Sequence, residues 1–189
     1  MSTTQWKRRL VAGAFACAIL PAAYAAAPAA NTVIGNQASA SYTDAAGNEF
    51  TATSNLVTST VQQVYSLTLT ATQSKSAAQG QFVYFPHTLT NTGNGADTFS
   101  LAKADGTPGV NNLAAPKVFR DNNANGVVDV GDQEIASINL AAGEQVALIV
   151  QTQTTTNQTD SVTLTATSQG DNTKTVTNTD TVNVVTGAV

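Results

Sequence analysis

The amino-acid sequence predicts an all-β protein, an immunoglobulin-like antiparallel β-sandwich with an N-terminal β-hairpin extension. From Asn31 onward, short runs rich in Thr, Val and Ser are separated by Gly, Asn and Asp turns. These runs alternate polar and apolar residues, and they lack the 3.6-residue period of amphipathic helices. The chain has 189 residues, of which 42% are hydrophobic and 11% charged. That length and composition are typical of one compact domain with a small appendage.

Residues 1–25 predict an export signal that is removed from the mature chain. Lys-Arg-Arg at 7–9 precedes an apolar run at 10–20, and Ala23-Tyr24-Ala25 supplies a small-residue cleavage site. The run is too short to span a membrane, which takes about 20 apolar residues. Acylation of Cys17 is disfavoured because the apolar stretch before it is short and because Phe15 is bulky beside the cleavage point that a lipoprotein would need. We therefore expect a secreted protein, extracellular or on the cell surface, whose mature chain does not insert into a membrane.

The charge of the mature chain argues against nucleic acid and anionic lipid as partners. Without residues 1–25, five basic residues face twelve acidic ones, which leaves a net charge of −7. Nucleic acids and anionic membranes are bound through clusters of Lys and Arg, and the mature chain has none. Removal of Cys17 also leaves no thiol for disulfides, cysteine catalysis or thiolate metal sites.

Residues 65–189 are expected to form the sandwich, with about seven strands between Tyr65 and Val185. Over the whole chain the alternation predicts strands near 32–43, 48–55, 57–63, 65–72, 82–91, 97–103, 117–121, 134–139, 145–154, 161–168 and 174–185. Period-2 alternation also assigns the residues that face the core. They are Val83, Phe85, His87 and Leu89, then Val146, Leu148 and Val150, then Val162, Leu164 and Ala166, and finally Val182 and Val184.

Residues 26–64 are expected to form a separate N-terminal strand and hairpin. Ala38, Ala40 and Tyr42 alternate with polar residues before an Asp-Ala-Ala-Gly-Asn turn at 44–48, and a return strand runs through Phe50. A two-stranded ribbon is marginally stable by itself. The hairpin is therefore expected to pack on the sandwich or to pair with another molecule.

The loop at 121–132 predicts a calcium site. Oxygen ligands stand at loop positions 1, 3, 5, 9 and 12, a glycine at 6 and an apolar residue at 8, which is the spacing of an EF-hand or dockerin-type loop. Gly126 permits the sharp turn that lets Val127 offer its backbone carbonyl. The proposed ligands are Asp121, Asn123, Asn125, Val127, Asp129 and Asp132. Two neutral Asn ligands and Asp in place of the final Glu predict an affinity of roughly 0.1 to 1 mM. The alternative is an Asn, Asp and Gly loop that turns without metal.

Three segments resemble bacterial surface proteins with DUF11-type immunoglobulin-like repeats. They are Leu-Thr-Asn-Thr-Gly-Asn-Gly-Ala-Asp-Thr-Phe at 89–99, the loop at 121–132, and Ile-Gly-Asn-Gln-Ala-Ser-Ala-Ser-Tyr at 34–42. The resemblance covers nearly the whole mature chain, although only one copy of the module is present. Such modules belong to long exported proteins of envelopes and extracellular fibres, so the resemblance implies a structural or adhesive role.

Residues that could carry enzymatic chemistry are few. His87, the one histidine, falls on the inward face between Phe85 and Leu89, and is expected to be a hydrogen-bonded core residue. Glu134 and Glu144 could in principle form a carboxylate pair for glycoside hydrolysis, but no aromatic sugar platform accompanies them. Lys75 is expected in a Ser-rich turn, which disfavours an isopeptide crosslink. Asn-Gln-Thr at 157–159 fits a glycosylation sequon that arises often by chance in Thr-rich sequence. We therefore expect a protein that is not an enzyme.

Two functions remain open at this point. The first is a non-enzymatic exported structural protein that assembles with other copies of itself, or with other surface proteins, into calcium-braced fibres. Its expected mechanism is addition of residues 26–37, with Thr32, Val33 and Ile34 as the apolar part, to a sheet edge of the next subunit. The same segment could instead fold back on its own sheet. The second function is a monomeric binding module or adhesin that uses calcium-ordered loops at 104–116 and 121–134.

Overall fold

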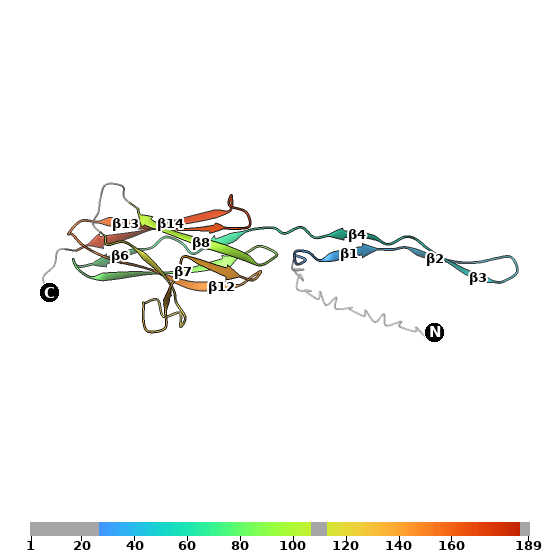
Figure 1. Ribbon diagram of the computed structural model, residues 1–189, viewed down its shortest axis with the longest axis horizontal. Helices are drawn as coiled ribbons and strands as arrows, with labels where there is room; N and C mark the ends of the chain where they lie inside the picture. The colour runs from blue at the N-terminus through green and yellow to red at the C-terminus, as the bar shows by residue number, and fades with distance from the viewer. Residues whose placement is uncertain (1–26, 107–112, 186–189) are drawn as a thin grey trace, which may run out of the picture.

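The computed structural model describes residues 27–106 and 113–185, and it is an elongated molecule with a β-sandwich at one end and a long β-ribbon at the other (Figure 1). The described residues contain no helix, and thus none that could cross a membrane. The all-β class, the immunoglobulin-like sandwich and the N-terminal hairpin extension are confirmed. The expected export signal at 1–25 lies outside the described residues.

The first sheet of the sandwich has five antiparallel strands in the order β10-β9-β12-β7-β5. Their bounds are β10 Gln133–Glu134, β9 Lys117–Arg120, β12 Gln145–Gln153, β7 Phe82–Asn91 and β5 Leu67–Leu69. β7 and β12 form the longest ladder of this sheet, which runs from the Phe82 and Gln153 pair to the Thr90 and Gln145 pair. The ends of this ladder define the two ends of the sandwich that are used below.

The second sheet has the order β11-β8-β13-β14-β6. Its strands are β11 Ser137–Leu140, β8 Asp97–Asp105, β13 Asp160–Ser168, β14 Thr175–Val184 and β6 Ser74–Ala77. β6 pairs with β14 in parallel, so the expectation of a wholly antiparallel sandwich is wrong at this edge. The Ser-rich segment around Lys75 is this edge strand and not a turn.

Two segments change sheets at places that the sequence did not predict. The predicted strand at 65–72 ends at Leu69, after which the chain crosses to the second sheet and continues as β6. The predicted strand at 134–139 divides in the same way, with β10 in the first sheet and β11 in the second. Both crossings lie at sheet edges, where a strand lacks a second neighbour to hold it in one sheet.

The two sheets pack face to face over a single apolar core, and the predicted inward residues form it. All of those on β7, β12 and β13 are buried, as is Val182, while Val184 is half-buried and packs against the core. Phe99, Leu101, Val118 and Leu140 complete the core from the other strands. The side chains with the least exposure are Phe85, Phe99, Leu89, Leu148 and Leu164.

The outer faces of the two sheets differ in chemistry. In the second sheet, the outward residues of β8, β13 and β14 are Ala, Ser, Thr and Asn, and cross-strand hydroxyls bond to each other, as Thr165 does with Thr177 at 2.8 Å. In the first sheet, strand alternation and register place Phe82, Tyr84, Phe119 and Ile149 on the outer face. Large apolar side chains therefore occupy only one of the two outer faces over the described residues.

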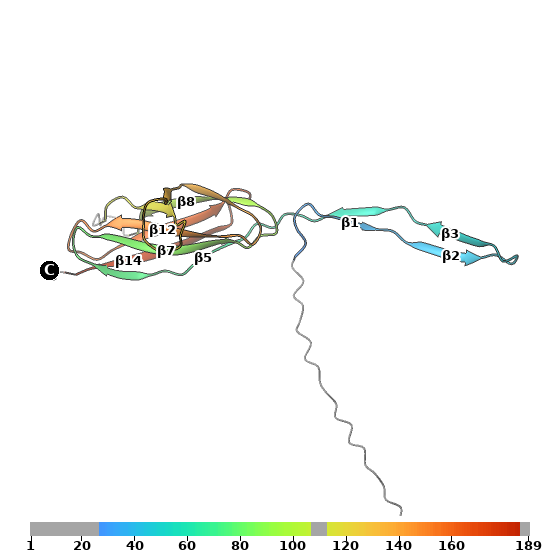
Figure 2. The same ribbon diagram turned by 90° about the horizontal axis from the view of Figure 1, so that it is seen from below.

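The ribbon consists of two consecutive antiparallel pairs. β1 Val33–Asn36 pairs with β4 Val57–Thr60, and β2 Ser39–Thr43 pairs with β3 Glu49–Thr53. The predicted turn at 44–48 is confirmed, because the carboxylate of Asp44 accepts backbone N–H bonds from Ala46 and Asn48, both at 2.9 Å. The ribbon extends away from the sandwich in both views (Figures 1 and 2).

Candidate functional site

The base of the ribbon is attached to the sandwich through Asn94. Its side-chain amide donates to the carbonyls of Pro28 and Gln62, and its Oδ1 accepts the N–H of Val64 at 2.7 Å. The backbone of Asn94 adds two bonds, accepting from Ala30 and donating to Val64. One residue of the sandwich thus holds both strands of the ribbon as they leave the domain.

The turn that carries Asn94 is shaped by Asn91 and Gly93, within the segment that resembles the surface-protein modules. The Nδ2 of buried Asn91 donates to the carbonyls of Gly95 and Leu140, and its Oδ1 accepts the N–H of Gly93 at 2.9 Å. A Cβ at Gly93 would lie 2.4 Å from the carbonyl oxygen of Val64, closer than any side chain tolerates. The segment at 91–95 therefore forms the turn to which the base of the ribbon is attached.

Every residue of the four ribbon strands is exposed, including several large apolar ones. Ile34 is 52% exposed, Tyr42 59% and Val57 69%. Register places Ala40, Ala52, Tyr42 and Phe50 on one face of the β2 and β3 pair, and Ser and Thr predominate on the other. The Tyr42 and Phe50 rings stack at 5.3 Å between centroids. A period-2 pattern of this kind normally has a partner on its apolar face.

The expectation for residues 26–37 needs correction. Val33 to Asn36 do not form a free donor strand, since each pairs with a residue of β4 in the same chain. The segment folds back on its own chain, which is the alternative that the sequence analysis left open. It pairs with β4, the second strand at the base of the ribbon, and not with a sheet of the sandwich. The hairpin also does not pack on the sandwich, so its apolar face stays open to solvent (Figure 2).

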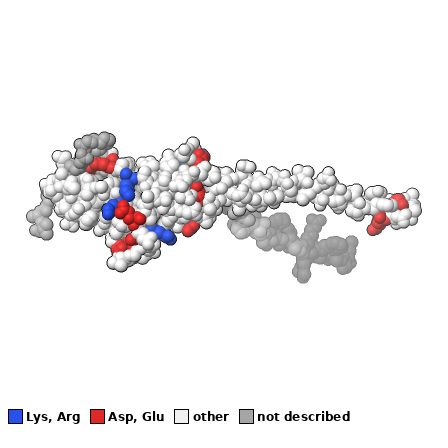
Figure 3. All heavy atoms as spheres, in the orientation of Figure 1, with Lys and Arg blue, Asp and Glu red and all other residues white. Residues whose placement is uncertain are grey.

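The strand edges of the sandwich are protected against pairing with another strand, whereas those of the ribbon are not. In the first sheet, Pro86 has no N–H to offer beyond the end of β5, and the carbonyls of Tyr84 and Pro86 accept from Lys75 and Gln73 side chains. Short edge strands of two to four residues bound both sheets. Such devices prevent edge-to-edge association. Residues 29–64 contain no Lys, Arg or Pro, and their two charges, Asp44 and Glu49, lie at the tip (Figure 3).

The predicted calcium loop projects from the first sheet between β9 and β10 (Figure 1). The two carboxylate oxygens of Asp121, which is 6% exposed, accept the N–H groups of Asn125 and Gly126. Gly126 has φ +78°, as the sharp turn requires. Asp132 closes the other side by accepting from Asn122 and Asp129 at 2.9 and 3.0 Å. These two backbone bonds, with that of Asn122 the stronger cause, hold the pKa of Asp132 below its usual value.

The side chains of the predicted ligands lie close together inside this loop. The amides of Asn123 and Asn125 donate to one oxygen of Asp129, at 2.8 and 2.7 Å. Among the described residues, no group of three or more His, Cys, Asp or Glu side chains is placed to hold a metal ion. Calcium would therefore depend on the two amides and the Val127 carbonyl as well as on the carboxylates, with both amides turned to present Oδ1. The oxygen atoms of these residues are the type of ligand that a hard cation prefers, and the side chains that carry them lie close together.

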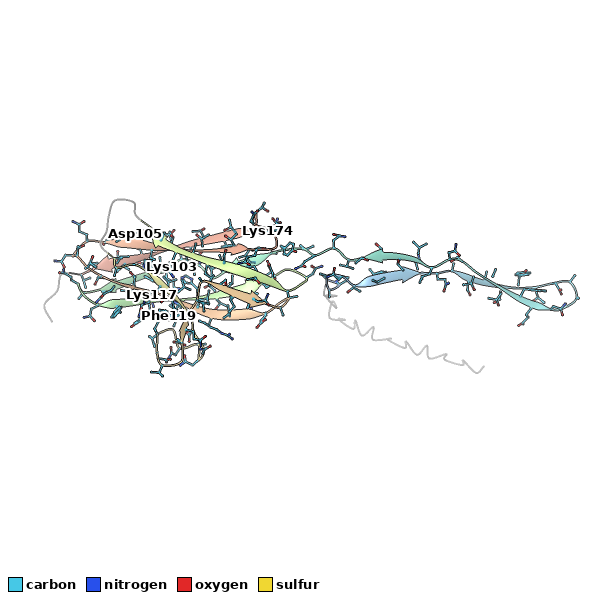
Figure 4. The ribbon with its side chains drawn as sticks, in the orientation of Figure 1. Lys103, Asp105, Lys117, Phe119 and Lys174 are labelled. Carbon is cyan, nitrogen blue, oxygen red and sulfur yellow. The ribbon has the colours of Figure 1, made fainter. Side chains whose placement is uncertain are left out.

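The residues considered for enzymatic chemistry make hydrogen bonds and ion pairs within the sandwich. His87 is 2% exposed, and its Nε2 lies 2.7 Å from Oδ2 of Asp180 on β14. Glu134 pairs with Lys103 and Lys117 at 3.4 and 3.3 Å, and this cluster lies beside Phe119 (Figure 4). Partial desolvation raises the pKa of Glu134, but the two lysines outweigh it and leave the pKa below its usual value. Glu144 accepts the N–H of Ala141 in a separate turn.

A groove of about 570 Å³ runs between the loop and the crossing from β5 to β6. Thr70 and Gln73 line one wall, Asn125 and Gly126 the other, and Pro86 lies at the floor. Part of the predicted loop at 104–116, residues 107–112, lies outside the described residues. The groove gives a binding module a place for a small ligand beside the loop at 121–134.

Comparisons with known proteins assign no family. No family model matches the chain, and no curated protein matches it. Solved structures resemble it at low identity. The secreted serine protease VesC from Vibrio cholerae has 14% identity and a TM-score of 0.44 over 66% of this chain and 24% of its own. A family 123 glycoside hydrolase from Clostridium perfringens has 10% identity and a TM-score of 0.45 over 65% and 27%.

A third resemblance is to AggA, the major subunit of aggregative adherence fimbriae type I from Escherichia coli. It has 14% identity and a TM-score of 0.40, over 66% of this chain and 96% of that one. The chain spans about a quarter of the length of the first two structures. Likeness at this level of identity concerns the fold alone.

Sequence reasoning missed the residues that set the ribbon in place. Asn94 stands in the Asn-Thr-Gly-Asn segment that the sequence analysis singled out, but its ribbon contacts reach back 30 to 66 residues. The pairing of the apolar positions on β2 with those on β3 was readable from the turn at 44–48, because a hairpin register follows from its turn. The turn does not, however, predict that these apolar side chains are exposed to solvent.

Proposed function

We propose that this protein is a non-enzymatic structural subunit of the bacterial cell surface or extracellular matrix that is exported and assembles into fibres. The ribbon is the assembling element, in place of the single N-terminal strand expected from the sequence. Membership of the DUF11-type modules is part of this proposal, and it rests on the sequence resemblance alone.

One observation carries the proposal: the ribbon extends from the sandwich with all four strands exposed and with an apolar face on its outer half. A two-stranded ribbon has little stability of its own in water. Large exposed apolar patches commonly mark interaction sites. The absence of Lys, Arg and Pro from residues 29–64 removes the usual protection of such strands against pairing.

The geometry favours open assembly over a closed dimer. The ribbon leaves one end of an elongated molecule (Figure 1). A contact between this end and a different surface of the next subunit is heterologous, and such contacts produce filaments when the rotation does not close. Because the sheet edges of the sandwich are protected against strand addition, we expect the ribbon to dock as a preformed two-stranded unit whose backbone hydrogen bonds are already made.

Calcium is proposed as a local brace of the loop at 121–132. Asp121, Asn123, Asn125, Asp129 and Asp132 would supply side-chain oxygens, and Val127 its carbonyl. When bound, the ion would neutralise the three carboxylates and order a loop that covers part of the outer face of the first sheet. The ribbon does not take part in this site, so calcium would modulate assembly through the loop only.

Light scattering and negative-stain microscopy of the processed protein test the proposal, with millimolar calcium and then with chelator. We expect filaments from the intact protein and monomers after residues 31–61 are replaced by a short Gly and Ser linker. Filaments that persist without the ribbon would overturn the proposal. A matched control, Ser41→Thr, changes the polar face of the ribbon but keeps its turn and its apolar residues, and it is expected to form filaments.

The groove beside the loop favours a second candidate, a monomeric binding module or adhesin. Its surface is mostly apolar, and the polar side chains of Thr70, Gln73 and Asn125 would give a small ligand hydrogen-bonding partners. Size separates the two functions, since a purified adhesin of this kind stays monomeric at all concentrations tested. A stable monomer with and without calcium would favour this second function.

A further inference from the structure

We propose that the ribbon of one copy docks on the outer face of the first sheet of a second copy, against Phe82 and Tyr84, with Glu49 beside Lys117. This inference rests on the proposed function and names the surface that receives the ribbon. It is called the acceptor face below, and it consists of Phe82, Tyr84, Lys117, Phe119 and Gln151.

The acceptor face offers the apolar surface that the ribbon lacks. Phe82 is 54% exposed, and its ring stacks on that of Tyr84 with centroids 6.5 Å apart. Phe119 lies on the same face through the register of β9 with β12. Flat aromatic surfaces of this kind match the stacked Tyr42 and Phe50 rings on the ribbon. Aromatic residues also contribute most of the binding energy in many interfaces.

The second sheet has no comparable face among the described residues. Its outward positions carry Ser, Thr, Ala and Asn, and hydroxyl pairs such as Thr167 and Thr175 satisfy each other at 2.9 Å. An apolar ribbon would gain little from covering hydroxyls that already have partners. The chemistry of the two faces therefore selects the first sheet.

Charge complementarity points to the same place. The two charges of the ribbon, Asp44 and Glu49, are both negative and stand at its tip (Figure 3). The acceptor face carries Lys117, whose side chain is 54% exposed although it contacts Glu134 at 3.3 Å. Lys103 contacts the same carboxylate from β8, so two lysines share one glutamate. The half-exposed ammonium group of Lys117, which lies beside Phe119, offers a positively charged partner to an acidic tip (Figure 4).

The occupant must be a second copy, because the ribbon of the same chain cannot reach this face. The Asn91 end of β7 adjoins the ribbon base through Asn94, whereas Phe82 begins β7 at the far end of the sandwich. The ribbon points away from that end (Figures 1 and 2). From Asn31 to Asp44 each arm is about 45 Å long at ~3.3 Å per residue, more than the ~33 Å of a ten-residue strand. A ribbon entering at the far end of the next sandwich therefore has the reach to cover the acceptor face.

A charge exchange between Glu49 and Lys117 tests the inference. Each single variant, Glu49→Lys and Lys117→Glu, is expected to raise the critical concentration for assembly on the order of tenfold, since an attraction becomes a repulsion. The double variant is expected to return to within about threefold of the original protein. Failure of the double variant to recover would overturn the inference. Lys174→Glu is the matched control, because Lys174 lies in the turn between β13 and β14 at the ribbon end of the sandwich (Figure 4).

A second measurement does not depend on charge. Phe82→Ser is expected to raise the critical concentration at least tenfold while the monomer keeps its melting temperature, since this side chain is already more than half exposed. Val130→Ser, at a more exposed apolar residue of the loop, serves as the control. Filaments that need the ribbon but form equally well with Phe82→Ser and Lys117→Glu would overturn the acceptor face and leave the proposed function standing. A protein that never assembles would overturn both.

Discussion

The imidazole of His87 on β7 lies 2.7 Å from the carboxylate of Asp180 on β14, so a hydrogen-bonded pair joins the two sheets inside the sandwich. Both side chains are fully buried. The other oxygen of Asp180 accepts the N–H of Gln73 at 2.8 Å, in the segment where the chain crosses between the sheets. The pair therefore also fixes the place of that crossing.

Replacement of Asp180 is expected to destabilise the sandwich according to the hydrogen bonds it loses. Asp180→Ala leaves Nε2 of His87 and the Gln73 N–H without partners, at a cost of about 1 to 3 kcal/mol for each group. Asp180→Asn can still accept from Gln73 and donate to His87, so its loss should be less than half as large. Urea unfolding measures both values. Thr179→Ala, on the exposed face of the same strand, should change stability by less than about 0.5 kcal/mol, and equal losses in the two Asp180 variants would contradict the assigned role.

Removal of the Asn94 side chain is expected to loosen the ribbon and leave the sandwich folded. Asn94→Ala loses the bonds to the Pro28 and Gln62 carbonyls and to the Val64 N–H. Hydrogen exchange of the Asn31 and Val61 amides, which bond across the ribbon base, should accelerate at least tenfold. The melting temperature of the sandwich should stay within a few degrees. Asn172→Ala, in an exposed turn, is the control, and unchanged exchange in Asn94→Ala would show that another contact holds the ribbon.

Calcium is expected to stabilise the protein in proportion to its occupancy of the loop. At a concentration ten to a hundred times the dissociation constant, binding to the folded state alone adds about 1.4 to 2.7 kcal/mol. Thermal melts at 10 mM calcium and in chelator measure the difference. Asp129→Asn should abolish most of it, because this carboxylate stands opposite both Asn123 and Asn125. Asp171→Asn, in a turn elsewhere, should retain the calcium response, and melts that are identical with calcium and chelator would refute the site.

The turn at the ribbon tip is expected to weaken only at acid pH. The Asn48 side chain and then its backbone N–H, together with Ala46, hold the pKa of Asp44 below the ordinary value of 3.8. Because the folded pKa is the lower one, the contribution of Asp44 to the turn is complete above about pH 4 and is lost as the pH falls through the folded value. NMR titration of the Ala46 and Asn48 amides should give a midpoint below 3.8. Asp44→Asn removes this transition, and a midpoint above 3.8 in the original protein would contradict the assigned bonds.

Local alternation was enough to predict most of the fold. The inward residues of β7, β12 and β13, the turn at 44–48 and the positive φ of Gly126 all follow from short stretches of sequence. Period-2 burial and turn chemistry depend on neighbouring residues, which are written side by side in the chain. The placement of His87 in the core was predictable for the same reason.

The calcium ligands illustrate an intermediate case. Their spacing within one loop predicted that their side chains would converge, and the bonds from Asn123 and Asn125 to Asp129 bring them together. Which atom of each amide faces the centre depends on whether an ion is present, because an amide can present either a donor or an acceptor. Spacing alone carries no information on that choice.

The sequence by itself thus determined most of the strands and their inward faces, the turn at 44–48, and the acidic, thiol-free character of the chain after Cys17. The tertiary structure decided which strands are neighbours: β6 beside β14 in parallel, His87 beside Asp180, and Asn94 beneath the ribbon. It also decided that the apolar face of Tyr42 and Phe50 stays exposed and is not packed on the sandwich. The physical reason is range, since alternation and turns act over a few residues whereas these pairings join segments 30 to 109 residues apart.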